Sequence, residues 1–325
     1  MTELDPKQPQ DESWERELLN RLAFATLNEQ RRTRRWGYFF KMLFLLYLFA
    51  LLVPLYPNLV GSIPHVVGNE EYTALIEVNG VIAPDTEASA DNVVSSLRAA
   101  FDDENVAGII LRINSPGGSP VQSGYIYDEI RRLKEKNSDK SVYAVVADLC
   151  ASGGYYIASA ADEIYVDQAS IVGSIGVLMN GFGFVDAIDK LGIERRLLTA
   201  GENKGFLDPF SPMKERDVAH VKTLLDDIHQ QFINNVKQGR GDRLKVDENP
   251  DLFSGLMWTG KQAVELGLAD GLGSSSYVAR ELIEAEEIKD FTKRPDYFER
   301  FAEGLGAAIA NTLAQQLQIT QQLIQ

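Results

Sequence analysis

The sequence predicts an α/β domain with helices on a mostly parallel sheet, preceded by a transmembrane helix. From about residue 72 onward, short apolar runs alternate with segments of helical periodicity. Two of these runs, residues 106–114 and 141–148, are apolar nearly throughout, as is typical of strands buried on both faces. The membrane helix is indicated by twelve consecutive apolar residues from Met42 to Val53.

The first 35 residues form a polar segment ahead of the apolar run. Within it Trp14, Leu18, Leu22 and Ala25 repeat at helical spacing. The segment is therefore either a short amphipathic helix or an irregular tail, and we expect it to be cytosolic.

The predicted membrane helix covers residues 36–56, about 31 Å as a helix, which matches the hydrocarbon thickness of a bilayer. The basic cluster RRTRR, residues 31–35, precedes it and no matching cluster follows, so the N-terminus is expected in the cytoplasm. A cleaved signal peptide is the alternative, but its basic region would be about 40 residues long and no A-x-A site follows. Residues 57–70, rich in Pro and Gly, indicate a linker.

The elements of the α/β domain follow in order from the alternation. Strands are expected at residues 73–83, 106–114, 141–148, 163–167 and 194–200. Helices are expected at residues 88–103, 121–136, 153–161, 184–192 and 211–238. Gly192 is expected to end the fourth of these helices, and Ser211 with Pro212 to begin the fifth. Residues 294–325 suggest a further helical tail.

Composition excludes several kinds of function. Residues 42–325 carry 24 Lys and Arg against 40 Asp and Glu, so no basic surface for nucleic acid is expected. Cys150 is the one cysteine, which excludes an internal disulfide and a cysteine-based metal cluster. The three histidines are scattered and form no metal-binding motif. We therefore expect neither a metal nor another cofactor.

The active groups of an α/β sheet gather where strands end and helices begin. Two of the expected strands end in residues that could take part in catalysis. In RINSPGGSP, residues 112–120, Gly117 and Gly118 could turn the backbone so that their amides bind an anion, although an ordinary turn has the same pattern. The second end carries Ser152, directly before Gly153. Ser152 is either the N-cap of the next helix or a hydroxyl exposed above the sheet, as in a nucleophile elbow, although the G-x-S-x-G spacing is absent.

A nucleophilic serine needs a base, and the histidines are poorly placed to supply one. His65 lies in the predicted linker, while His220 and His229 are nine residues apart on one expected helix and face opposite sides. Lysine is the remaining candidate. Lys204 lies in the loop TAGENKGFLDPFSP, residues 199–212, beside apolar residues, although a lysine in such a loop is also often simply solvated.

Four motifs in order resemble the signal peptide peptidase A family, the S49 serine peptidases, in the short form with one repeat and an N-terminal anchor. They are NSPGG, ASGGYYIASAAD, GSIGV and TAGENKGFLDPFSP, and MWTGKQAVELGLADGLG further along is also similar to that family. The resemblance implies a ClpP/crotonase-like fold for a peptidase domain of residues 71–293. It also implies a homo-oligomeric ring in which neighbouring protomers share a catalytic site.

The resemblance further implies a role for six residues. Ser152 matches the nucleophile, Lys204 the general base, Ser174 the residue that orients the lysine, and Gly118 and Gly153, with Gly117 as a third candidate, the oxyanion hole. The expected activity is that of a membrane-anchored serine endopeptidase outside the bacterial cytoplasmic membrane, in the periplasm. It would degrade hydrophobic peptides such as released signal peptides. The rival interpretations are a crotonase-like acyl-CoA enzyme and a non-catalytic membrane scaffold.

Overall fold

The computed structural model describes residues 34–48 and 71–294, and the chain divides into two units, Met1–Gly68 and Asn69–Gln325. In the first unit a helix covers residues 34–48. Within the described ranges, no helix has both the length and the apolar character needed to span a bilayer. The second half of the predicted membrane helix, most of the N-terminal segment, the linker and almost all of the C-terminal tail lie outside the described residues.

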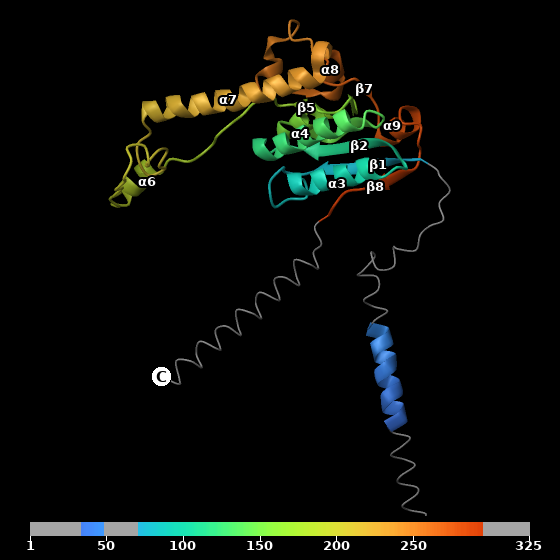
Figure 1. Cartoon of the computed structure of the whole chain (residues 1–325). Helices are drawn as coiled ribbons and strands as arrows, with labels where there is room; N and C mark the ends of the chain where they lie inside the picture. Colours follow the sequence, from blue (N-terminus) through green and yellow to red (C-terminus); the bar gives the residue numbers. More distant parts are fainter. Residues whose placement is uncertain (1–33, 49–70, 295–325) are drawn as a thin grey trace, which may run out of the picture. The chain divides into compact units, whose positions relative to one another are not determined.

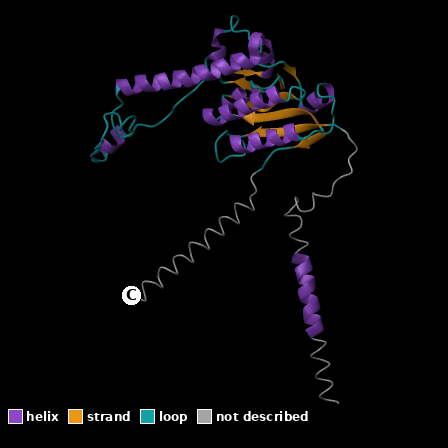
Figure 2. Ribbon diagram, in the orientation of Figure 1, coloured by secondary structure: helices purple, strands orange, loops and turns teal. Residues whose placement is uncertain are grey.

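The second unit is built on one eight-stranded sheet, drawn as arrows in Figures 1 and 2. Its strands are β1 (Tyr72–Asn79), β2 (Val106–Ser115), β3 (Ser141–Ala151), β4 (Glu163–Val166), β5 (Ile171–Gly173), β6 (Met257–Thr259), β7 (Gly271–Leu272) and β8 (Ile288–Asp290). Their order is β6-β5-β3-β2-β1-β8, and β4 pairs with both β3 and β7. The β5–β6 pair is antiparallel and every other pair in the sheet is parallel, which confirms the predicted mostly parallel sheet.

Helices follow most of the strands along the chain and pack on the faces of the sheet. They are α3 (Ala90–Asp102), α4 (Pro120–Lys136), α5 (Gly153–Ala158), α6 (Val185–Lys190), α7 (Glu215–Arg240), α8 (Gly260–Glu265) and α9 (Ser275–Glu281), with short 3-10 turns at Gly241–Arg243 and Pro250–Phe253. Strand β2 shows how the two faces differ. Ile109, Leu111 and Ile113 belong to the main core beneath α3, α4 and α5, whereas Ile110 points into a smaller cluster beneath α9.

Two expected elements differ from the structure. Residues 194–200 form no strand, because this stretch has no neighbouring strand to receive its backbone hydrogen bonds, and Leu198 is 96% exposed. Helix α7 begins at Glu215 rather than after Ser211. The Ser211 hydroxyl donates to a carboxylate oxygen of Asp208 at 2.6 Å, so it is engaged in the preceding turn and caps no helix.

Residues 178–214, which we call the arm, connect β5 to α7 and include α6. The arm has some internal order, since the Phe184 amide donates to the Pro209 carbonyl at 2.7 Å and Phe184 stacks on Phe210. Figure 1 shows α6 outside the layers of sheet and helices. Large apolar side chains of the arm are exposed, among them Leu178, Met179, Phe182, Leu191, Ile193, Leu198 and Met213. The arm therefore lacks a core of its own.

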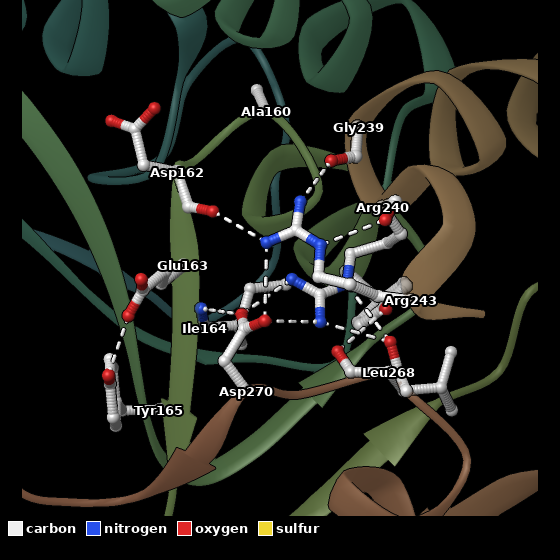
Figure 3. A network of polar contacts seen from close by, with 12 residues as sticks. Ala160, Asp162, Glu163, Ile164, Tyr165, Gly239, Arg240, Arg243, Leu268 and Asp270 are labelled. Atoms are coloured by element: carbon white, nitrogen blue, oxygen red, sulfur yellow. Dashed lines mark hydrogen bonds and ion pairs between the residues drawn. The ribbon is translucent and has the colours of Figure 1, made fainter.

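The C-terminal end of α7 is fastened to the sheet by the buried ion pair drawn in Figure 3. The Arg240 guanidinium is 1% exposed and donates to both carboxylate oxygens of Asp270, at 2.6 and 3.0 Å. Burial alone would raise the pKa of Asp270, but hydrogen bonding and the charge of Arg240 outweigh it and lower that pKa. Nearby, the Tyr155 hydroxyl of α5 donates to the Leu268 carbonyl at 2.8 Å. Helices α5 and α7 are thus held by the same loop, residues 267–270.

Candidate active site

Ser152 occupies the turn between β3 and α5. Its backbone has φ 52° and ψ −120°, a conformation that is strained for a residue with a side chain. Its amide donates to the Gly173 carbonyl at 2.8 Å, which ties the turn to β5. Although Ser152 stands at the N-cap position of α5, its side chain makes no capping hydrogen bond. Within residues 34–48 and 71–294 the hydroxyl has no hydrogen-bond partner, as a nucleophile elbow requires and an N-cap does not.

The loop after β2 lies directly against this turn. Gly118 has a positive φ, and a Cβ at this position would collide with the Ile82 carbonyl oxygen, so the loop needs a glycine here. A Cβ on Gly153 would lie 3.2 Å from the Gly118 amide nitrogen, which shows how near the two backbones come. Among the described residues, neither the Gly118 nor the Gly153 amide has a hydrogen-bond acceptor. Two unpaired donors therefore lie beside the Ser152 hydroxyl, as an oxyanion hole needs.

Gly117 differs from the other two glycines. Its amide donates to the Ser115 hydroxyl at 3.1 Å, so the structure leaves two of the three predicted oxyanion donors free. The same Ser115 hydroxyl donates to the Gly80 carbonyl at 2.6 Å, and its side chain is fully buried. Ser115 thus holds the glycine loop against the turn that follows β1. Nothing in the sequence distinguishes Ser115 from an ordinary serine of a turn.

We expect Ser115→Ala to lower kcat about tenfold with little change in KM, because a loosened glycine loop would place the Gly118 amide less precisely. The matched control is Ser96→Ala on α3. Ser96 is also buried, donates to the Asn92 carbonyl and accepts from the Lys293 amide. Both variants should lose about 1–2 kcal/mol of unfolding free energy, measured by urea denaturation. Equal kcat values for the two variants would show that Ser115 has no positioning role.

A cavity of about 890 Å³ opens at the serine, which is within the size range of ligand pockets. Its lining comes from the loop after β2 and helix α4 (Pro116, Gly118, Pro120, Val121, Gly124, Tyr125, Asp128), the turn and helix α5 (Ser152, Gly153, Tyr156), the chain after β5 (Ser174, Gly176, Val177, Leu178), helix α7 (Ile228, Gln231, Phe232) and the loop before β6 (Ser254, Gly255). The structure thus brings Ser152, Ser174 and two of the glycines predicted to form the oxyanion hole, Gly118 and Gly153, together in one cavity.

Ser174 follows β5 in a strained conformation like that of Ser152, with φ 51°. Its amide donates to the Leu256 carbonyl at 2.7 Å, which fixes the turn. Among the described residues its hydroxyl has no partner, so it is free to bind a group that enters the cavity. The His229 ring lies close by, with Nε2 3.0 Å from the Ile175 carbonyl, so this histidine supports the turn after Ser174 and does not line the cavity.

Lys204 is not part of this cavity within one chain. It lies in the arm, is exposed, and does not line the cavity. Of the apolar neighbours expected around it, Phe206 and Leu207 are half-buried and Phe210 is exposed. The described chain therefore brings together the predicted nucleophile and two of the predicted oxyanion donors but leaves the predicted base outside.

Comparisons with known proteins identify the family of the chain. The profile of peptidase family S49 matches residues 134–289, and that of the Clp protease matches residues 71–171. Protease 4 of Haemophilus influenzae is 33% identical over 205 residues, which cover 62% of this chain and 32% of that protein. The candidate protease slr0021 of Synechocystis sp. is 32% identical over 211 residues, covering 65% of this chain and 73% of that protein. The chain belongs to the signal peptide peptidase A family, peptidase family S49.

Another relative matches this chain over only a small part of its own length. Residues of this chain are 52% identical, over 177 positions, to part of the Na⁺/H⁺ antiporter NhaA of Brucella melitensis. That alignment covers 54% of this chain but only 24% of the antiporter, so this chain spans about a quarter of the length of that protein.

Proposed function

We propose that the protein is a serine endopeptidase in which Ser152 is the nucleophile and Lys204 the general base. The observation that carries the proposal is the free Ser152 hydroxyl at a strained turn, facing a cavity beside two unpaired backbone amides. This arrangement suits acyl transfer, because the hydroxyl can attack a carbonyl carbon while the amides receive the developing oxyanion.

In the proposed reaction the Ser152 hydroxyl attacks the scissile carbonyl and its proton passes to a neutral Lys204. The Gly118 and Gly153 amides stabilise the tetrahedral oxyanion, each by about 2.7–4 kcal/mol if they act like other such donors. The lysine then gives the proton to the leaving amine, and an acyl-enzyme on Ser152 remains. Lys204 next activates a water that hydrolyses the ester, which restores both residues. Ser174 would hold the lysine amine by a hydrogen bond.

Lys204 is proposed to come from a neighbouring protomer of a homo-oligomeric ring. The support is its position in the exposed arm, outside the cavity of its own chain. The exposed apolar side chains of the arm would become buried against another copy, and that burial would favour the neutral form that a lysine base needs. A head-to-tail contact of this kind closes into a ring when its rotation permits.

We further propose that residues 36–56 anchor the protein in the bacterial cytoplasmic membrane with residues 71–293 as a periplasmic peptidase domain. The support is the apolar run from Met42 to Val53 and the basic cluster at residues 31–35. A peptidase held at the membrane suits hydrophobic peptides that stay near it, such as signal peptides already released from their proteins.

Covalent labelling tests the nucleophile directly. A fluorophosphonate probe is expected to label the full chain in detergent, and peptide mapping should place the adduct on Ser152. Ser174→Ala should still be labelled on Ser152, at the native rate or more slowly. Ser152→Ala should not be labelled. A crotonase-like enzyme or a scaffold would show no such adduct, so absence of the adduct on a folded protein would refute the proposal.

A further inference from the structure

The outer wall of the cavity is one face of α4. Val121, Gly124, Tyr125 and Asp128 follow one another at helical spacing and all line the cavity. Gly124 presents no side chain, and the nearest heavy atom to a Cβ placed there is the Tyr156 hydroxyl oxygen, at 3.9 Å. The missing side chain of Gly124 therefore leaves space in the cavity next to the Tyr156 hydroxyl.

The far part of this wall carries a negative charge. Among the described residues that line the cavity, Asp128 alone is charged. No ion pair or hydrogen bond within the described ranges involves its carboxylate, and Arg131, one turn further along α4, does not pair with it. The charge is thus available to a ligand in the cavity.

Tyr156, from α5, lines the same cavity as Ser152 and Asp128. Its hydroxyl accepts a hydrogen bond from the Asn235 side-chain amide, which fixes the ring against α7. Burial raises the pKa of Tyr156, and the negative charge of Asp128 raises it as well, which agrees with a carboxylate close to the phenol. The Tyr156 hydroxyl and the Asp128 carboxylate are thus two polar groups of the cavity, beside the apolar Val121.

We propose that Asp128 selects substrates with a lysine or arginine near the scissile bond. The inference rests on the proposed function of Ser152. A long basic side chain fits such a wall, since its methylene stem packs on Val121, Tyr125 and Phe232 while its charged end reaches Asp128. The substrate class becomes hydrophobic peptides that carry a basic residue, rather than hydrophobic peptides in general.

The length of α4 restricts the position of that residue. Asp128 lies about 12 Å along the helix from Pro120, at roughly 1.5 Å per residue. Pro120 closely follows the oxyanion glycine Gly118. A lysine ammonium lies only about 6 Å from its Cα, whereas an extended peptide rises about 3.3 Å per residue. The selected side chain is therefore two or three positions from the scissile bond rather than next to it.

The test is a positional scan with the full chain in detergent. Fluorogenic peptides with an apolar sequence receive lysine, norleucine or glutamate at one position in turn, up to three positions on each side of the bond. Norleucine is the matched control for the stem without the charge. The proteins compared are the native chain, Asp128→Asn, Asp128→Lys and the control Glu135→Gln, whose carboxylate is exposed on the same helix and does not line the cavity.

We expect kcat/KM to be about tenfold higher for lysine than for norleucine at one of these positions, as a charge-assisted contact provides. Asp128→Asn should remove that ratio, Asp128→Lys should favour glutamate, and Glu135→Gln should change nothing. Cleavage that depends on Ser152 but shows no such ratio would overturn the role of Asp128 and leave the peptidase proposal intact. A uniform loss with every peptide in Asp128→Asn would also overturn it. Absence of any Ser152-dependent cleavage would overturn both.

Discussion

Replacing Ser152 with alanine is expected to lower kcat for a fluorogenic peptide by about 10⁴-fold or more, because no other group can form the acyl-enzyme. The hydroxyl makes no hydrogen bond within the described residues, so its loss should not disturb the fold. The melting temperature and circular dichroism spectrum of the variant should therefore match those of the native protein. Turnover within tenfold of the native rate would exclude Ser152 as the nucleophile.

Ser152→Gly is a useful companion to this variant. It removes the same hydroxyl but also relieves the strain of a side chain at φ 52°. We expect it to be as inactive as Ser152→Ala and about 1 kcal/mol more stable towards urea. A residue that lowers the stability of the fold but presents a free hydroxyl is typical of a functional turn.

Replacing Lys204 with alanine is expected to lower kcat by about 10³-fold or more, since the serine would lose its base while the oxyanion donors remain. Lys204 is exposed and its side chain has no partner in the described chain, so the variant should melt like the native protein. Lys190→Ala is the matched control, because Lys190 is an exposed lysine of the same arm. Equal rates for Lys204→Ala and Lys190→Ala would exclude Lys204 as the base.

Much of the sheet could be predicted from the sequence, because a strand buried between layers of helices must be apolar along its length. Residues 106–114 and 141–148 show this pattern and form the central strands β2 and β3. The prediction was wrong for residues 194–200, whose composition also suits a strand. A strand exists only where a neighbour accepts its hydrogen bonds, and that depends on distant parts of the chain.

The candidate site was predictable to a smaller extent. The segment around Ser152 fits both an N-cap and a nucleophile, and in the sequence only the family resemblance favours the nucleophile. The backbone torsion and the missing capping bond, which argue against an N-cap, arise on folding. The hydrogen bond that engages the Gly117 amide, and the approach of α4 and α7 to the cavity, arise only on folding. The spacing of Val121, Gly124 and Asp128 was visible in the sequence, but nothing in it indicated that this helical face lines the site.

The arm carries Lys204, the predicted base, and its position relative to Ser152 could not be predicted from the sequence of one chain. Its apolar side chains are exposed, so the contacts that would determine its place are not among those of a single described chain. We therefore propose that Ser152 of one protomer is activated by Lys204 of another.

Complementation between two inactive variants shows whether the two residues act across protomers. Ser152→Ala and Lys204→Ala chains would be produced together in equal amounts and purified as mixed oligomers through two different tags. A site then works where an intact Ser152 meets an intact Lys204 from the adjacent protomer, so we predict about one quarter of the native activity. Mixed oligomers that contain both chains and remain as inactive as either variant alone would contradict the shared site.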